Sequence, residues 1–237
     1  MDAPAPQPAG LFLFDKPKGI TSHDAVYMLR RKLSIQKIGH SGTLDPMATG
    51  LLILLVGAAT RSQSALQGSA KVYGGTILFG AETDTWDAEG RVVAEAPAPS
   101  FEPAVLAAAV KRFDGKIIQQ VPPYSAVKVG GKKLYDLARR DQAVPEVRRE
   151  VEVRWLSFSA RPPELDFEIE CSGGTYIRSI ACELGRALGS RAHLSALRRL
   201  RIGSYDVGEA VTAERLAAMT REETLAMLRP APGGGLA

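Results

Sequence analysis

The feature that most constrains this chain is a glycine-rich loop that runs directly into an apolar segment. Residues 39–50 read GHSGTLDPMATG, and the apolar run LLILLV follows at residues 51–56. The glycines and the proline predict a loop, while the length and branching of the apolar run predict a buried strand. Asp45 is therefore expected on a turn at the end of a core strand. A carboxylate is costly to bury unless it is paired or used, so this loop is the first candidate for chemistry.

Length and composition are those of an ordinary globular protein. The 237 residues, 45% hydrophobic and 24% charged, suffice for one large domain or two joined lobes. Residues 1–8 lack the basic segment and long apolar core of a signal peptide. The longest apolar run, residues 51–59, is far shorter than the ~20 residues of a membrane span. We therefore expect a cytoplasmic protein with no membrane partner.

The cysteine and histidine content argues against metal and disulfide chemistry. The chain has two cysteines, Cys171 and Cys182, and three histidines, His23, His40 and His193. Their spacing matches neither a zinc site nor a disulfide framework, which predicts reduced, structural thiols. The sequence also lacks P-loop and Rossmann signatures.

The net charge of +4 is distributed unevenly along the chain. Residues 82–102 hold six acidic residues against one arginine, whereas residues 171–205 hold six arginines against Glu183 alone. A local excess of arginine suits a polyanionic partner such as nucleic acid. A solvated basic face would produce the same pattern.

The rest of the pattern predicts short strands alternating with helices. The expected strands are residues 11–14, 51–56, 71–79, 91–93, 151–158, 165–171 and 199–205. The expected helices are residues 22–33, 60–66, 101–113, 176–188 and 212–219, with a further short helix from His193. We expect Thr21 or Ser22 to cap the first helix and Thr175 to cap the fourth. Residues 82–90 are expected to form an acidic loop.

A basic, proline-punctuated stretch at residues 122–145 is the second candidate for function. Gly130-Gly131 predicts a hairpin turn, and basic residues alternate with Tyr124 and Tyr135. The basic side chains are Lys128, Lys132, Lys133 and Arg139. The pattern is typical of a mobile arm that lies on a phosphate backbone, although a solvated surface excursion would look alike.

Three further residues have ambiguous signals. Arg178 falls in the first turn of a predicted helix, where a cation opposes the helix dipole, which indicates an anionic partner. Tyr73 could simply be a packed aromatic residue of its strand. Lys16 could be a turn cation, but it would lie at the same sheet edge as the Asp45 loop if the two strands are neighbours.

Taken together, five segments resemble the motifs of TruB-type tRNA pseudouridine synthases. The segments are DKPKGITS at residues 15–22, GHSGTLDPMATGLL at residues 39–52, KVY at residues 71–73, GTYIRSI at residues 174–180 and HLSALRRL at residues 193–200. Their order and spacing are similar to those of the family from about residue 11 to residue 211. The resemblance implies an α+β fold with a mixed, mainly antiparallel central sheet flanked by helices, and a catalytic cleft between two lobes.

The resemblance also implies the reaction. A uridine at position 55 in the T-loop of tRNA is detached from its sugar, turned and rejoined through carbon, without metal, nucleotide or redox cofactor. The base lies in a folded loop and must be flipped out first. Asp45 would be the nucleophile or charge stabiliser and Arg178 the cation paired with it. Tyr73 would stack on the flipped base, where the proton lost on rejoining could be taken up.

Other residues take supporting roles by resemblance. His40 would enter the space that the base leaves, and Tyr176, Ile177 and Leu197 would line the apolar pocket around it. Lys16 would support the catalytic loop or a phosphate. The family's RNA-gripping insertion corresponds to about residues 121–149.

The resemblance also sets the expected domain boundaries. We expect a disordered tail at residues 1–10, the catalytic domain at residues 11–219 and a short tail at residues 220–237, with the family's PUA domain absent or vestigial. The expected partner is the tRNA T-arm, bound by a monomer that needs no protein partner.

Three alternatives remain at this point. One is the catalytic subunit of a guide-RNA pseudouridylation particle, and a second is a tRNA-folding chaperone whose main function is binding. The third is a serine hydrolase, suggested by Gly39-His40-Ser41-Gly42. The nucleophile elbow needs one more residue between the serine and the second glycine, so the sequence argues against it.

Overall fold

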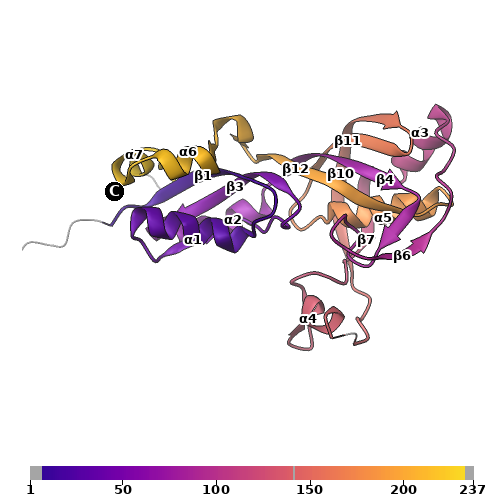
Figure 1. Ribbon diagram of the computed structural model, residues 1–237, viewed down its shortest axis with the longest axis horizontal. Coiled ribbons are helices and arrows are strands. Elements are labelled where there is room, and N and C mark those ends of the chain that lie inside the picture. The colour runs from indigo at the N-terminus through magenta and orange to yellow at the C-terminus, as the bar shows by residue number, and fades with distance from the viewer. Residues whose placement is uncertain (1–6, 141, 233–237) are drawn as a thin grey trace, which may run out of the picture. The chain divides into compact units, whose positions relative to one another are not determined.

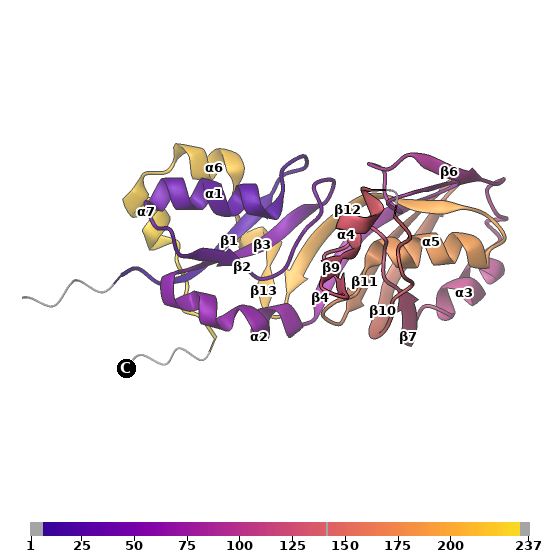
Figure 2. The same ribbon diagram turned by 90° about the horizontal axis from the view of Figure 1, so that it is seen from below.

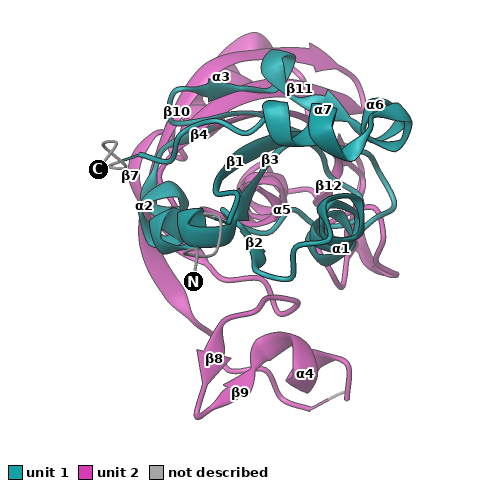
Figure 3. Cartoon of the chain, turned by 90° about the vertical axis from the view of Figure 1, so that its left-hand side faces the viewer, with its two compact units in different colours: residues 1–71, 198–237 teal, residues 72–197 magenta. Residues whose placement is uncertain are grey.

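The chain forms two compact units, each of which combines a sheet with helices. The computed structural model describes residues 7–140 and 142–232. Unit 1 consists of residues 1–71 and 198–237, and unit 2 of residues 72–197 (Figure 3). The chain passes from one unit to the other within strands β4 (Lys71–Phe79) and β12 (Ala192–Ile202).

Unit 1 is built around a mixed sheet with the order β14-β1-β3-β12. Its strands are β1 (Gly10–Lys16), β2 (Ile38–His40), β3 (Thr49–Val56), β13 (Tyr205–Asp206), β14 (Val211–Thr212) and the end of β12. β3 is antiparallel to β1 and β2, β14 is parallel to β1, and β13 is antiparallel to β12. β12 is parallel to β3, with Arg198 opposite Thr49 and Arg199 opposite Gly50. This pairing places β12 beside the start of β3, where the Asp45 loop ends.

The core of unit 1 explains why β3 reads as a continuous apolar run. All six residues 51–56 are fully buried, so both faces of β3 are covered. One face joins alternate residues of β1 and β3 with Leu66 of α2 (Gln63–Gly68) and Ile202. Because side chains alternate across a strand, Leu52 and Leu54 lie on the other face. Figure 2 shows α1 and α2 on either side of β1 and β3.

Helix α1 (Ser22–Leu33) begins where the sequence predicts. The Thr21 hydroxyl accepts a hydrogen bond from the Asp24 amide, and the Asp24 carboxylate accepts one from the Thr21 amide, which forms a capping box. Val26, Leu29 and Leu33 are buried, as the spacing predicts. Each such side chain stabilises the fold by about 1.5–3 kcal/mol. The remaining short elements of unit 1 are η1 (Gly57–Ser62), η2 (Val207–Glu209), α6 (Ala213–Ala218) and α7 (Arg221–Ala226).

Unit 2 contains a sheet with the order β12-β4-β11-β10-β7. β10 (Arg148–Arg161) is antiparallel to both β11 (Glu164–Cys171) and β7 (Gly115–Gln120). β11 alternates partly and fully buried residues, so one of its faces lies in the core. The helices α3 (Pro103–Lys111) and α5 (Ile177–Ala187) lie beside this sheet (Figures 1 and 2). The predicted mixed, mainly antiparallel α+β fold is thus confirmed.

Two hairpins extend unit 2. β5 (Ala81–Thr83) pairs with β6 (Val92–Glu95), so the acidic segment begins as a strand and only then turns. β8 (Lys128–Val129) pairs with β9 (Lys132–Lys133) around Gly130-Gly131, as predicted, and α4 (Leu134–Ala138) follows. Figure 3 shows β8, β9 and α4 projecting from the rest of unit 2. We call residues 121–149 the arm.

Several expectations about secondary structure are wrong. His193 does not begin a helix but lies in β12, where its ring nitrogen Nδ1 is 2.8 Å from the Ala81 carbonyl oxygen. Thr175 does not cap α5, because its hydroxyl donates to the Ser172 carbonyl and the helix begins at Ile177. The short helix expected at residues 60–66 is present, but it divides between the 3-10 helix η1 and α2.

Elements of unit 1 begin or lie within the two segments expected as tails, where the structure describes them. β1 already begins at Gly10, and α7 lies inside the predicted C-terminal tail. The Leu11 and Arg229 backbones exchange two hydrogen bonds, which ties the C-terminal segment to β1. Residues 1–6 and 233–237 lie outside the described residues. Across residues 7–140 and 142–232, no helix has the length and apolar character needed to cross a membrane.

Candidate active site

Asp45 opens a tight turn between β2 and β3. The Ala48 amide donates a hydrogen bond of 3.1 Å to the Asp45 carbonyl, which closes the turn over Pro46 and Met47. Leu44 and Met47 on either side are buried, whereas Asp45 is partly exposed. The apolar neighbours therefore anchor the turn on both sides of Asp45.

The segment of the first motif holds this turn from one side. The Ser22 hydroxyl accepts a 2.8 Å hydrogen bond from the Leu44 amide and lies 3.1 Å from the Leu44 carbonyl. The Gly19 amide donates to the Pro46 carbonyl at 2.8 Å. The residues on both sides of Asp45 are thus fixed by residues 19–22.

Lys16 is fully buried beneath the same turn. Its Nζ donates to the carbonyls of Pro17 at 2.9 Å, Ile20 at 2.8 Å and Pro46 at 3.4 Å. These contacts join the first motif to the Asp45 turn. The placement fits the supporting role expected of Lys16 and not that of an exposed phosphate ligand.

His40 lies at the start of the loop, where its surroundings favour the neutral ring. Its Nδ1 accepts a hydrogen bond of 3.3 Å from the Gly42 amide. Burial lowers the pKa of His40 below its usual value, and the positive charges of Arg199 and His23 act in the same direction. A neutral ring can leave water for a base-sized space at a lower cost than an imidazolium.

In unit 2, Arg178 lies in the first turn of α5 and is buried. Its guanidinium donates to the Thr85 carbonyl at 2.9 Å and the Tyr124 carbonyl at 3.2 Å, and lies 3.5 Å from the Asp87 carboxylate. Asp87 is itself held by the Thr85 hydroxyl at 2.7 Å and the Glu89 amide at 3.0 Å. Asp45 belongs to unit 1, and its pairing with Arg178 stays a prediction.

Asp87 is a residue that the sequence reasoning missed. It was part of the acidic segment 82–102, which gave no sign that one carboxylate is buried beside Arg178. The predicted anionic partner at the start of α5 was the signal that could have led to it. An arginine in the first turn of a helix calls for a nearby carboxylate, and residues 82–102 contain the candidates.

Tyr176 and Ile177 are fixed at the start of α5 by β7. The buried Gln119 accepts a 2.7 Å hydrogen bond from the Tyr176 amide and donates one of 3.3 Å to its carbonyl. The Arg149 guanidinium lies 5.6 Å from the centre of the Tyr176 ring. Ile177 is buried, as is Tyr73 in β4, and Leu197 in β12 is partly exposed.

The arm presents its basic side chains to solvent. Lys128, Lys132, Lys133 and Arg139 are all exposed. The Arg139 guanidinium lies 5.5 Å from the centre of the Tyr135 ring and donates to its hydroxyl at 3.1 Å. Tyr135 in turn meets Tyr124 edge to face at 6.1 Å. The aromatic contacts thus support Arg139.

Most arginines of residues 171–205 are either buried or paired with a carboxylate of the same chain. Arg186 forms a bidentate pair with Glu82, and Arg198 forms one with Asp15. Arg178 and Arg199 are buried. A general basic surface is therefore not the main role of these arginines.

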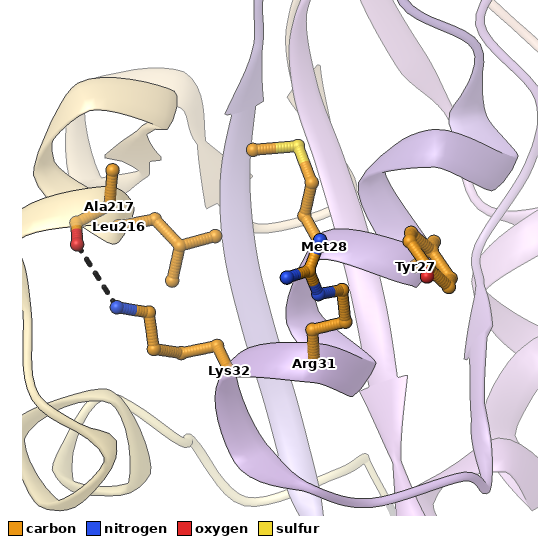
Figure 4. A pocket seen from close by; sticks show the side chains of 6 residues that line it. All are labelled: Tyr27, Met28, Arg31, Lys32, Leu216 and Ala217. Atoms are coloured by element: carbon orange, nitrogen blue, oxygen red, sulfur yellow. Dashed lines mark hydrogen bonds between the residues drawn. The ribbon is translucent and has the colours of Figure 1, made fainter.

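A pocket of about 540 Å³ on unit 1 lies between α1 and α6 (Figure 4). It is lined by Tyr27, Met28, Arg31, Lys32, Leu216 and Ala217. Lys32 Nζ donates to the Ala217 carbonyl at 3.0 Å. None of the site residues predicted from the sequence lines this pocket.

Comparison with known proteins agrees with this reading of the motifs. The model of the TruB family pseudouridylate synthase N-terminal domain matches residues 30–177, more than half of the chain. The chain belongs to the TruB family. The model of the tRNA pseudouridylate synthase B C-terminal domain matches residues 178–231. The family resemblance of the sequence is thus confirmed, and the chain is an enzyme, a tRNA pseudouridine synthase and hence an isomerase.

Relatives named tRNA pseudouridine synthase B match nearly the whole chain. That of Xanthomonas campestris pv. campestris (strain B100) is 43% identical over 228 residues, which are 95% of this chain and 74% of the relative. That of Opitutus terrae is 44% identical over 222 residues, 93% of this chain and 92% of the relative.

Solved structures support the fold. A chain in the crystal structure of a Cbf5-Nop10-Gar1 complex matches 94% of this chain with a TM-score of 0.67 at 28% identity. This chain covers 60% of the length of that chain.

Proposed function

We propose that this TruB-family enzyme converts uridine 55 in the T-loop of tRNA to pseudouridine, with Asp45 as the catalytic carboxylate. The observation that carries the proposal is the way the Asp45 turn is built. Its neighbours Leu44 and Pro46 are held by Ser22, Gly19 and Lys16, while Asp45 stays partly exposed. A carboxylate in one fixed position loses little freedom when it reaches its target, which lowers the barrier to reaction.

The proposed reaction needs an ionised Asp45 and a flipped base. The target uridine leaves the folded T-loop and enters the site. Asp45 then acts on the sugar or on the uracil ring as nucleophile or charge stabiliser, the glycosidic bond breaks, and the base rejoins through carbon. The proton on that carbon leaves last, next to Tyr73, and the ring nitrogen freed from the sugar takes up a proton, so the number of atoms in the RNA does not change.

Arg178 would stabilise the ionised form of Asp45. Its guanidinium is held by the Thr85 and Tyr124 carbonyls beside Asp87, so its orientation is set before RNA binds. A preoriented cation contributes more than a mobile one, because nothing has to reorganise during the reaction. His40 would occupy the space that the flipped base leaves.

The remaining residues would bind and enclose the RNA. Tyr176, Ile177 and Leu197 would surround the detached uracil and keep it from escaping. The exposed cations of the arm would contact the phosphates of the T-arm: Lys128, Lys132, Lys133 and Arg139. We further propose that the enzyme acts as a cytoplasmic monomer, without cofactor or protein partner.

Mapping the product tests the proposal. Purified chain is incubated alone with an unmodified tRNA transcript, and pseudouridine is located by chemical labelling and primer extension. We expect one modified position, in the T-loop, and the same position in an isolated T-arm hairpin. Modification that appears only with added guide RNA would favour the guide-RNA alternative, and binding without modification would favour the chaperone.

A further inference from the structure

Arg199 in β12 is the largest of the fully buried side chains, with 1% of its surface exposed. Its Nε donates to the Leu51 carbonyl at 2.7 Å, and its two Nη atoms lie 3.3 Å from the Gly42 carbonyl and 3.5 Å from the Thr43 carbonyl. Within the described residues, no acidic side chain forms an ion pair with it. The partners of this buried cation are thus backbone oxygens.

These three carbonyls belong to the two ends of the Asp45 loop. Gly42 and Thr43 precede Asp45, and Leu51 follows the turn at the start of β3. The guanidinium therefore bridges the chain entering the loop and the chain leaving it. A buried charge without a carboxylate is costly, and hydrogen bonds to three carbonyls offset only part of that cost.

Gly50 brings the Arg199 backbone against the loop. Its φ of +99° favours glycine, and a Cβ at this position would lie 2.3 Å from the Arg199 carbonyl oxygen. The parallel pairing of Arg199 with Gly50 uses this close approach. Both the side chain and the backbone of Arg199 thus contact the exit of the loop.

We propose that Arg199 is a positioning residue that ties the two ends of the Asp45 loop and fixes the carboxylate before RNA binds. Its planar guanidinium is suited to this because it directs several N–H groups at fixed angles. A lysine at this position would keep the charge but would have a single nitrogen for carbonyls on both sides of the loop. The catalytic part of this inference rests on the function proposed above, whereas the ordering of the loop does not.

The test uses three variants of the full chain. Arg199→Lys keeps the charge and loses the planar group, and Arg199→Met keeps a similar length and loses both. Lys32→Met is the matched control, because Lys32 Nζ also donates to two carbonyls of unit 1, those of Ala217 and Met219, which are remote in sequence from the Asp45 loop. Circular dichroism and thermal melting first establish that each variant is folded.

Two readouts then separate positioning from general stability. For Arg199→Lys we expect the single-turnover rate on tRNA to fall about 10- to 100-fold, while the Kd for tRNA stays within about twofold. Amide hydrogen exchange over residues 41–51 should accelerate in both Arg199 variants and not in Lys32→Met. Arg199→Met should lower the single-turnover rate at least as much as Arg199→Lys.

The possible results distinguish a failure of the positioning role of Arg199 from a failure of the proposed function. A wild-type rate and unchanged exchange in a folded Arg199→Lys variant would overturn the positioning role. Equal losses in rate and in affinity would also overturn it, because they would indicate an RNA-contacting or globally structural residue. If the wild-type chain forms no pseudouridine in tRNA, the proposed function fails, and the exchange measurement still decides whether Arg199 orders the loop.

Discussion

Replacing Gly50 with alanine tests the packing of the Asp45 loop against β12. The backbone term comes from φ, since a φ of +99° costs a non-glycine residue roughly 1–2 kcal/mol. The steric term comes from the new Cβ, 2.3 Å from the Arg199 carbonyl oxygen and 2.8 Å from its amide nitrogen. Both contacts are with backbone, so the strands must separate, which costs about 1–3 kcal/mol more. The expected loss in the free energy of unfolding is therefore about 2–5 kcal/mol.

Gly19→Ala is the matched control for this prediction. Gly19 has a similar φ of +89°, but a Cβ there meets nothing within 4 Å. The free energy of unfolding of Gly19→Ala should therefore fall by the backbone term alone, about 1–2 kcal/mol. Urea unfolding followed by circular dichroism compares both variants with the wild type, and hydrogen exchange of the β3 amides reports on unit 1 itself. Equal destabilisation by the two substitutions would refute the steric part of the argument.

Three further predictions concern charge and burial. Replacing Lys132, Lys133 and Arg139 with alanine should weaken tRNA binding and reduce the slope of log K against log salt by about 0.7–0.9 per lost phosphate contact, and an unchanged slope would place the arm away from phosphate. Burial raises the pKa of the Cys182 thiol far above its usual range, so it should resist iodoacetamide at pH 8 in the native protein and react once urea unfolds it, as mass spectrometry can determine. The pKa of His40 is lowered in the folded state, so the unfolded chain binds the proton more readily. Its contribution to stability should therefore be complete above about pH 6.5 and decline as the pH falls toward the folded pKa, and a titration by NMR with a midpoint at or above the unfolded value would contradict this.

Local sequence signals predicted the elements that are governed by local physics. Thr21 and Asp24 form the cap of α1, the run at residues 51–56 forms the buried part of β3, and Gly130-Gly131 turns the β8–β9 hairpin. The cap and the hairpin turn are satisfied by neighbouring residues, whereas the β3 run is visible in the sequence because a strand buried on both faces has to be continuously apolar. The contact between the first motif and the Asp45 loop also follows from the sequence, because β1 ends at Lys16 beside the start of β3, where the loop ends.

The errors arise where distant contacts decide the structure. Residues 192–202 are rich in alanine, leucine and arginine and favour a helix, but β12 forms because strands distant in the sequence, β3 and β4, supply its hydrogen-bond partners. The strand then points Arg198 and Arg199 to opposite faces, one toward Asp15 and one into the core. A one-dimensional charge count cannot separate two adjacent arginines in this way.

Asp87 shows the same limit at the candidate site. It lies 91 residues before Arg178 in the sequence, and a sheet and a helix of unit 2 have to form before the two meet. The motif containing Arg178 was recognisable, but the identity of the carboxylate beside it required the fold. Pairs of charged residues that are far apart in the sequence are therefore the part of such a site that is hardest to predict from the sequence.

The most direct test of the central claim is the single-turnover rate of Asp45→Asn on tRNA, measured by release of tritium from uridine labelled at carbon 5. Asparagine keeps the size of the side chain and removes the charge, so the Kd for tRNA should stay close to that of the wild type. The account predicts a rate at least about 10⁴-fold lower than that of the wild type. A rate within tenfold of the wild type, with the same affinity, would show that Asp45 is not the catalytic carboxylate.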